Sequence, residues 1–214
     1  MKKSSWINTV LFVSVFLLTI LFVFWFLKSA YFPILNLWIQ SNIILYVVSL
    51  FFVKILGIVW PPISGGVFTL ASIPFLGWKL AFITDFCGST VGGLIAYYLG
   101  SKYGFPFLNK LLGDDIVNKI KKVKIKKGRE IEAVFVYRFL FGSVILEAIY
   151  YGAGVLNINF GRFVIGAVLS HIVIGVPIFF LASSIFSGAN MVLTISLSII
   201  ALVIILKTKG RYFE

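Results

Sequence analysis

Apolar residues form six long stretches along the chain, separated by shorter polar segments. Four of these stretches are uninterrupted: Trp6–Leu27, Trp78–Leu99, Phe160–Phe186 and Met191–Leu206. A helix rises about 1.5 Å per residue, so about 20 apolar residues cross a hydrocarbon core of about 30 Å. The pattern therefore predicts an all-α integral membrane protein with about four transmembrane helices.

The other two apolar stretches are broken in the middle. The first, at about residues 45–77, is interrupted by prolines and glycines from Pro61 to Gly66, and the second, at about 131–158, by Gly142 and Ser143. A break at membrane depth frees backbone N–H and C=O groups that lipid cannot satisfy. Such a break must be buried in protein or line a wet cavity, so we predict a re-entrant helical hairpin at each.

The two broken stretches and the spans that follow them resemble copies of one unit. When the sequence is shifted by 82 residues, similar residues coincide: Ala71 with Ala153, Trp78 with Phe160, Ile83 with Ile165 and Gly93 with Gly175. Transporters are often built from two such units of opposite orientation. We therefore expect an inverted repeat in which the hairpins enter the membrane from opposite faces.

The distribution of basic residues supports this topology. Lysine or arginine clusters at Lys2-Lys3, at nine positions from Lys102 to Arg129, and in the tail from Lys207 to Arg211. Cytoplasmic segments are enriched in these residues. With both hairpins re-entrant, all three clusters fall on one side, whereas a first hairpin that crossed fully would separate them. We expect a multi-pass protein of the cell (plasma) membrane with both termini in the cytoplasm.

The basic loop has a pattern of its own. Asp114 and Asp115 suit a helix N-terminus, lysines fill the turns that follow, and Gly128 suits a left-handed residue after the helix end. Apolar residues recur at helical spacing on one side. The loop is predicted to form an amphipathic helix on the cytoplasmic surface, with lysines toward anionic headgroups. A plain positive-inside loop is the alternative.

Composition narrows the possible functions. The chain has 214 residues, of which 60% are hydrophobic and 12% charged, against about 25% charged in soluble domains. Cys87 and His171 are the single cysteine and histidine, so neither a disulfide framework nor a Cys/His metal cluster is possible within the chain. The sequence shows no nucleophile–base set and no phosphate loop. We expect no enzymatic activity, no cofactor and no metal. The net charge of +12 is concentrated where topology requires it, so no nucleic-acid partner is expected.

Four charged residues lie well inside the apolar stretches, away from their ends, and are the candidates for function: Lys54, Asp85, Arg138 and Glu147. Lys79 and Arg162 lie near the starts of their spans and are expected to extend to the membrane interface. A charge at the bilayer centre costs at least about 2.5–3.5 kcal/mol, so such residues usually face the protein interior and pair. Arg138 and Glu147 flank the second break. Either Arg138 binds a phosphate headgroup through its guanidinium fork while Glu147 tunes it or takes a proton, or the two form a structural ion pair.

The first half offers a second set of candidates. Asp85 is either a proton site or an acceptor for backbone freed at the first hairpin tip, and Lys54 can pair with it. At that tip, the backbone N–H groups of Ser64, Gly65 and Gly66 can cradle an anion, although a tight turn also needs small residues. His171, in the middle of a span, is interpreted as a hydrogen-bonded packing residue rather than a proton relay.

Two segments of the sequence resemble a known family. Between Val59 and Gly104 the chain has a proline-rich hairpin tip, WPPISGG, a small-residue exit, and a glycine-rich span, GSTVGGLIAYYLG. The second half, YRFLFGSVILEAIYYGAGVLNINFGRFVIG, carries an arginine in its hairpin. This pattern, over roughly residues 45–186, resembles the DedA/VTT-domain family, also called SNARE-associated Golgi proteins. The resemblance implies opposed re-entrant hairpins and movement of phospholipids or polyprenyl-phosphate lipids between leaflets, tied to the proton gradient in some bacterial members.

Only part of the family pattern is present. Bacterial DedA proteins typically carry an acidic residue near the first tip, where this chain has Ser64-Gly65-Gly66. They also carry a proline and a second arginine, where this chain has Phe141 and Val144. Of the family's hairpin residues only Arg138 carries over, which favours the more divergent VTT branch.

Three segments follow from these observations. Residues 1–44 are expected to form an uncleaved N-terminal transmembrane anchor and an interfacial segment, 45–186 a VTT/DedA-like domain, and 187–214 a C-terminal transmembrane helix with a basic tail. The favoured function is a flippase- or scramblase-like lipid translocase, with membrane lipids of anionic headgroup as partners and a homo-oligomer possible. The alternatives are a proton-coupled secondary transporter of a small anion or ion, and a membrane scaffold protein.

Overall fold

The computed structural model describes residues 25–60, 65–123, 125, 128–141 and 146–187. Within these ranges every regular element is an α-helix. The named helices are α2 (Tyr31–Ser41), α3 (Ile43–Val59), α4 (Gly65–Ala71), α5 (Ile73–Leu112), α6 (Asp114–Lys121), α7 (Glu130–Phe141), α8 (Leu146–Val155) and α9 (Phe160–Phe186). The chain divides into two compact units, one ending at Tyr46 and the other beginning at Val47. The candidate site lies in the second unit.

Two described helices, α5 and α9, are long and apolar enough to cross a membrane, and α2 with α3 adds a third if this bent pair forms one span. The prediction of one continuous apolar helix at Phe160–Phe186 is confirmed, since α9 begins and ends at these residues, and it is one of the candidate spans. Large apolar side chains such as Ile83 on α5 and Phe180 on α9 are exposed. The predicted span Met191–Leu206, and almost all of Trp6–Leu27, lie outside the described residues.

Helix α5 is bent at two glycines that define its membrane-length part. Gly77 has φ 71° and Gly104 has φ 65°, a region that only glycine enters without steric cost. The helix between these bends contains the predicted span Trp78–Leu99. The straight segment of α5 thus ends at two glycines, at positions where a residue with a side chain would be strained in the bent backbone conformation.

Both predicted breaks coincide with helix ends. Helix α3 ends at Val59 and α4 begins at Gly65, while α7 ends at Phe141 and α8 begins at Leu146. The tips between them, including Gly142 and Ser143, lie outside the described residues. Helices that flank both breaks are therefore present, whereas the hairpins, their re-entrant course and their inverted relation remain predictions.

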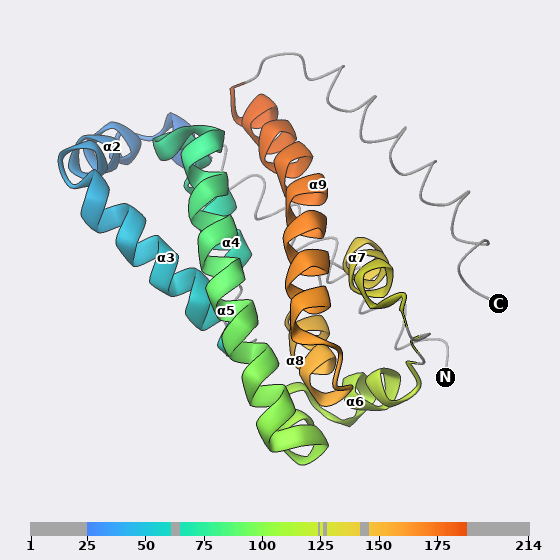
Figure 1. The fold of residues 1–214 in the computed structure, drawn as a ribbon. Coiled ribbons are helices and arrows are strands. Elements are labelled where there is room, and N and C mark those ends of the chain that lie inside the picture. Colours follow the sequence, from blue (N-terminus) through green and yellow to red (C-terminus); the bar gives the residue numbers. More distant parts are fainter. Residues whose placement is uncertain (1–24, 61–64, 124, 126–127, 142–145, 188–214) are drawn as a thin grey trace, which may run out of the picture. The chain divides into compact units, whose positions relative to one another are not determined.

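Helix α5 lies at the centre of the second unit and contacts α4, α8 and α9, while α7 contacts α8 and α9 (Figure 1). The backbones of α5 and α8 touch. A Cβ atom at Gly154 would overlap the carbonyl oxygen of Tyr97, and one at Gly100 would overlap that of Tyr151. Such close packing through small residues is typical of membrane helices.

A tyrosine of the second hairpin also reaches the first. The Tyr151 hydroxyl donates a hydrogen bond of 2.7 Å to the carbonyl oxygen of Val59, the last residue of α3. The final carbonyls of a helix have no partner within it. This bond therefore completes the end of α3 with a group from α8.

The basic loop forms a shorter helix than predicted. Helix α6 begins at Asp114, and Gly128 has φ 92°, both as expected. The helix ends at Lys121, however, so the prediction that it continues to Gly128 is wrong. Its apolar side is buried in the protein core, where Ile120 contacts Gly152 of α8.

Candidate functional site

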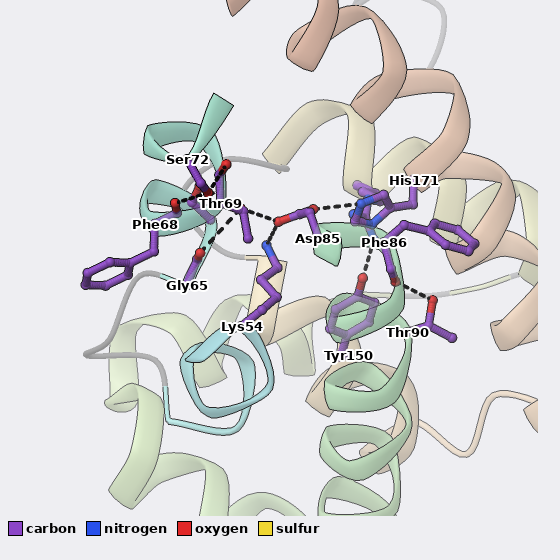
Figure 2. A network of polar contacts seen from close by, with 12 residues as sticks. Lys54, Gly65, Phe68, Thr69, Ser72, Asp85, Phe86, Thr90, Tyr150 and His171 are labelled. Carbon is purple, nitrogen blue, oxygen red and sulfur yellow. Dashed lines mark hydrogen bonds and ion pairs between the residues drawn. The ribbon is translucent and has the colours of Figure 1, made fainter. Parts of the chain in front are cut away.

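A chain of polar side chains runs through the interior of the second unit. It joins Lys54 of α3, Asp85 of α5, His171 of α9, Arg138 of α7 and Tyr150 of α8. Figure 2 labels Lys54, Asp85, Tyr150 and His171. None of the five is more than 6% exposed. We call these five residues the central network. It connects helices of both predicted hairpins through the two long helices between them.

Asp85 is the acid of the central network and is fully paired. Its Oδ1 lies 2.6 Å from Lys54 Nζ and accepts a hydrogen bond of 2.6 Å from the Thr69 hydroxyl of α4. Its Oδ2 lies 2.9 Å from His171 Nε2. A buried carboxylate is tolerated only when its oxygens are paired in this way. Both oxygens of Asp85 are therefore paired with groups from three other helices, α3, α4 and α9.

Glycines bring Lys54 to this position. A Cβ atom at Gly88 of α5 would lie 2.8 Å from Lys54 Cβ and Cγ, and one at Gly65 of α4 would lie 3.0 Å from Lys54 Cα. Both distances are below ordinary contact. The lysine stem thus fills the space that missing side chains leave on the two neighbouring helices, and its ammonium reaches Asp85.

Arg138 has a different environment. Its Nη1 donates to the Tyr150 hydroxyl, and its Nη2 contacts Nδ1 of His171. The guanidinium carbon lies 5.6 Å from the Tyr150 ring centroid, a cation–π distance. The rings of Phe82 and Phe86 pack at 5.9 and 5.5 Å from the His171 ring. Among the described residues, the hydrogen-bonding partners of Arg138 are thus a phenol and an imidazole, neither of which carries a negative charge.

The predicted pairing of Lys54 with Asp85 is confirmed. Gly65 and Gly66 begin α4 beside Lys54, and a Cβ at Gly66 would lie 3.5 Å from Lys54 Nζ. Ser64 lies outside the described residues. Glu147 belongs to α8, but its side chain also lies outside the description, so its pairing with Arg138 remains a prediction.

The sequence pattern does not single out Tyr150. His171 is predicted to be a hydrogen-bonded packing residue, and it does make hydrogen bonds, but its position between Asp85 and Arg138 is not predicted. One signal could have found the histidine. Each half has a cation in its broken stretch and one titratable residue in the middle of the next span, Asp85 and then His171. Buried charges are usually paired, so the two cations are expected to contact the two mid-span residues.

A small cavity adjoins the central network. Its lining includes Ser89, Thr90, Tyr150 and His171, and it has room for about one water molecule. The Ser89 hydroxyl oxygen is buried and has no hydrogen-bond partner in the described part of the chain. A headgroup does not fit here in this conformation. Among the described residues there is also no cluster of three metal-ligating side chains.

Comparisons with known proteins identify the family. No curated protein and no solved structure matches the chain. A family model described as the VTT domain matches residues 9–185, which include both hairpins and both long helices. Together with the apolar helices α5 and α9, this match agrees with a membrane protein. The chain belongs to the VTT-domain (DedA) family.

Proposed function

We propose that this protein is a lipid translocase, which moves phospholipids or polyprenyl-phosphate lipids between leaflets without chemical conversion. One observation carries the proposal: Arg138 is a buried cation whose described partners, Tyr150 and His171, bring no negative charge. The guanidinium fork matches the geometry of a phosphate. A phosphate headgroup is therefore the kind of ligand that this site lacks.

The charges of the central network support this choice. Lys54 and Arg138 are cations, and Asp85 is the acid among the described members. Because Asp85 contacts Lys54 directly, its negative charge offsets that of Lys54 and not that of Arg138. A buried cation without a counter-charge is costly. We propose that a headgroup supplies that charge during transport.

Transport requires the central network to open. Arg138 is 6% exposed and the neighbouring cavity holds about one water molecule, so a headgroup can reach the guanidinium only after Arg138 leaves its partners. The observed conformation is a closed one in this scheme. The headgroup would then pass along the polar side chains of the central network while its acyl tails stay in lipid.

We also propose a placement in the membrane. The basic loop and both termini face the cytoplasm of the cell membrane, in agreement with the positive-inside rule. In that placement the lysines of the loop lie near anionic headgroups, which raises their local concentration at the protein.

The proposal is tested by reconstitution. The purified full chain is placed in liposomes with labelled phosphatidylethanolamine, phosphatidylglycerol or polyprenyl phosphate, and the accessibility of each label to an external quencher is followed. We expect Arg138→Ala to slow exchange about tenfold or more, since a charge-assisted hydrogen bond contributes roughly 1.5–3 kcal/mol. Arg138→Lys should restore part of the rate because it keeps the charge and loses the fork.

Arg162→Gln is the matched control, because this arginine is half-exposed and pairs with Glu130 outside the central network. Its exchange rate should equal that of the unaltered protein. Unchanged exchange in Arg138→Ala would remove Arg138 from the mechanism. No exchange of any lipid by the unaltered protein would contradict the proposed function.

A small-anion transporter is the second candidate. The same buried Arg138 supports it, because both described partners of its guanidinium lack a negative charge and a free anion could supply one. Phosphate uptake into the same liposomes, with no lipid exchange, would favour this function over lipid translocation.

A further inference from the structure

The central network fixes the protonation of His171. Arginine carries only N–H donors and has no lone pair to offer. Because Arg138 Nη2 contacts His171 Nδ1, that ring nitrogen must be the acceptor and carry no proton. The ring proton then resides on Nε2 and is donated to Asp85 Oδ2 at 2.9 Å. One tautomer of the neutral ring satisfies both neighbours.

A second proton would disrupt this arrangement. It would bind to Nδ1, the atom that accepts from Arg138, so that two N–H groups and two positive charges would face each other in a buried site. Such like-charge contacts are strongly unfavourable. Proton binding by His171 and its contact with Arg138 therefore exclude each other.

The other neighbours of the ring do not remove this conflict. Asp85 of α5 favours a charged ring, but its charge is shared with Lys54 of α3. The Tyr150 hydroxyl of α8 accepts a hydrogen bond from Arg138 and is uncharged. The rings of Phe82 and Phe86 cover the imidazole without adding charge.

We propose that His171 is a proton-binding site that releases Arg138 to an anionic phosphate group, so that proton and phosphate bind together. The identity of the anion as a lipid headgroup rests on the proposed function. The charges agree with joint binding: Lys54 and Arg138 with Asp85 leave one positive charge. A proton and a singly charged phosphate diester add to zero, so the loaded site carries the same charge as the empty one.

The cavity beside the ring offers a place for the proton donor. It touches His171 and has room for about one water molecule. The buried Ser89 hydroxyl, which has no partner among the described residues, lines it and can hold that water. A water molecule there reaches the imidazole without passing through the Lys54–Asp85 pair.

The sequence allows a direct test, because His171 is the single histidine. Growth on ¹⁵N-histidine labels this ring alone in the full chain, provided that the affinity tag contains no histidine. Nitrogen shifts then report the tautomer and the protonation state. We expect a neutral ring with its proton on Nε2. In Arg138→Gln the ring should bind its second proton at least about tenfold more tightly, since a neighbouring like charge is gone.

Short-chain phosphatidylglycerol and inorganic phosphate are the two probes. Each should promote ring protonation if it draws Arg138 away, and an effect of the lipid alone would show that the headgroup is recognised in its lipid. Neither probe should act in Arg138→Gln, whereas Arg162→Gln should respond like the unaltered protein. A proton on Nδ1 of the neutral ring, or equal proton affinity with and without Arg138, would overturn the inference.

Transport separates this inference from the proposed function. Lipid exchange should be faster at about pH 6 than at about pH 8, and His171→Gln and His171→Asn should remove this difference because neither side chain titrates. If no lipid is exchanged at any pH, lipid translocation fails, while the nitrogen shifts still decide the proton site. If the unaltered protein exchanges lipid equally at both pH values, the coupling is wrong and translocation stands.

Discussion

Lys54 and Arg138 are both buried cations on the first helical arm of a predicted hairpin, but they are held by different kinds of partner. Lys54 lies 2.6 Å from a carboxylate, while Arg138 contacts an imidazole and a phenol. The difference separates two roles. A cation with its own acid is a structural element, whereas a cation held by uncharged groups can exchange them for an anionic ligand.

The largest effect that this comparison predicts is on stability. Asp85→Asn leaves the Lys54 ammonium buried without a counter-charge, and breaking a buried pair in this way costs about 3–5 kcal/mol. Arg138→Gln removes a charge whose described partners carry no negative charge, so it should lower the free energy of unfolding far less. Equilibrium unfolding of both variants in mixed micelles measures the contrast.

The double variant Lys54→Met/Asp85→Asn is the control for that experiment. It removes both charges, so it should be more stable than Asp85→Asn alone. Equal losses in Asp85→Asn and Arg138→Gln would show that the two cations are equivalent and would refute the comparison.

A smaller loss of stability is expected when Lys54 is displaced but Asp85 is still present to pair with it. In Gly88→Ala the new methyl group would lie 2.8 Å from Lys54 Cβ and Cγ. Overpacking of this kind costs roughly 1–3 kcal/mol. Unfolding in micelles gives the loss, and Gly161→Ala, where the nearest atom is 3.5 Å away, is the matched control. If both glycine variants are equally stable, the stem of Lys54 is not confined as described.

The smallest effect concerns an ion pair at the helix starts. Arg162 Nη1 lies 2.7 Å from Glu130 Oε2, close to the Lys54–Asp85 distance, but the arginine is half-exposed. The backbone N–H at the start of α7, and then the Arg162 guanidinium, lower the pKa of Glu130. A lowered pKa stabilises the fold above the ordinary value of 4.5, and this stabilisation is lost as pH falls through the lowered pKa.

Arg162→Gln should therefore lower stability slightly at neutral pH, and the difference should vanish in acid and at about 1 M salt, where screening acts within about 3 Å. Unfolding at several pH values and salt concentrations checks this. A loss as large as that of Asp85→Asn would mean that burial does not distinguish the two ion pairs.

The sequence predicts the long helices well because membrane thickness fixes their length. The bounds of α9 follow from its apolar stretch, and the start of the straight part of α5 follows from Gly77. The pairing of Lys54 with Asp85 was also predictable, since a buried charge needs a partner. In the basic loop, lysines are good helix formers, and no proline or glycine comes between Lys121 and Gly128. Helix propensity alone therefore predicts a helix that continues beyond Lys121, where the observed α6 ends.

The role of His171 could not be read from its own helix. A single histidine in an apolar span has the same local pattern whether it packs or titrates. Its environment depends on α5 and α7, which lie far away in the sequence and meet it only in the folded protein. Residues that act through such non-local contacts need the structure to be recognised.

The bond from Tyr151 to Val59 has a consequence for biogenesis. The two residues are 92 positions apart, so the ribosome completes α3 long before it makes the tyrosine that satisfies its final carbonyl. An unsatisfied carbonyl in lipid costs several kcal/mol. The end of α3 therefore acquires this partner only after the second half of the chain has been made and has packed against it.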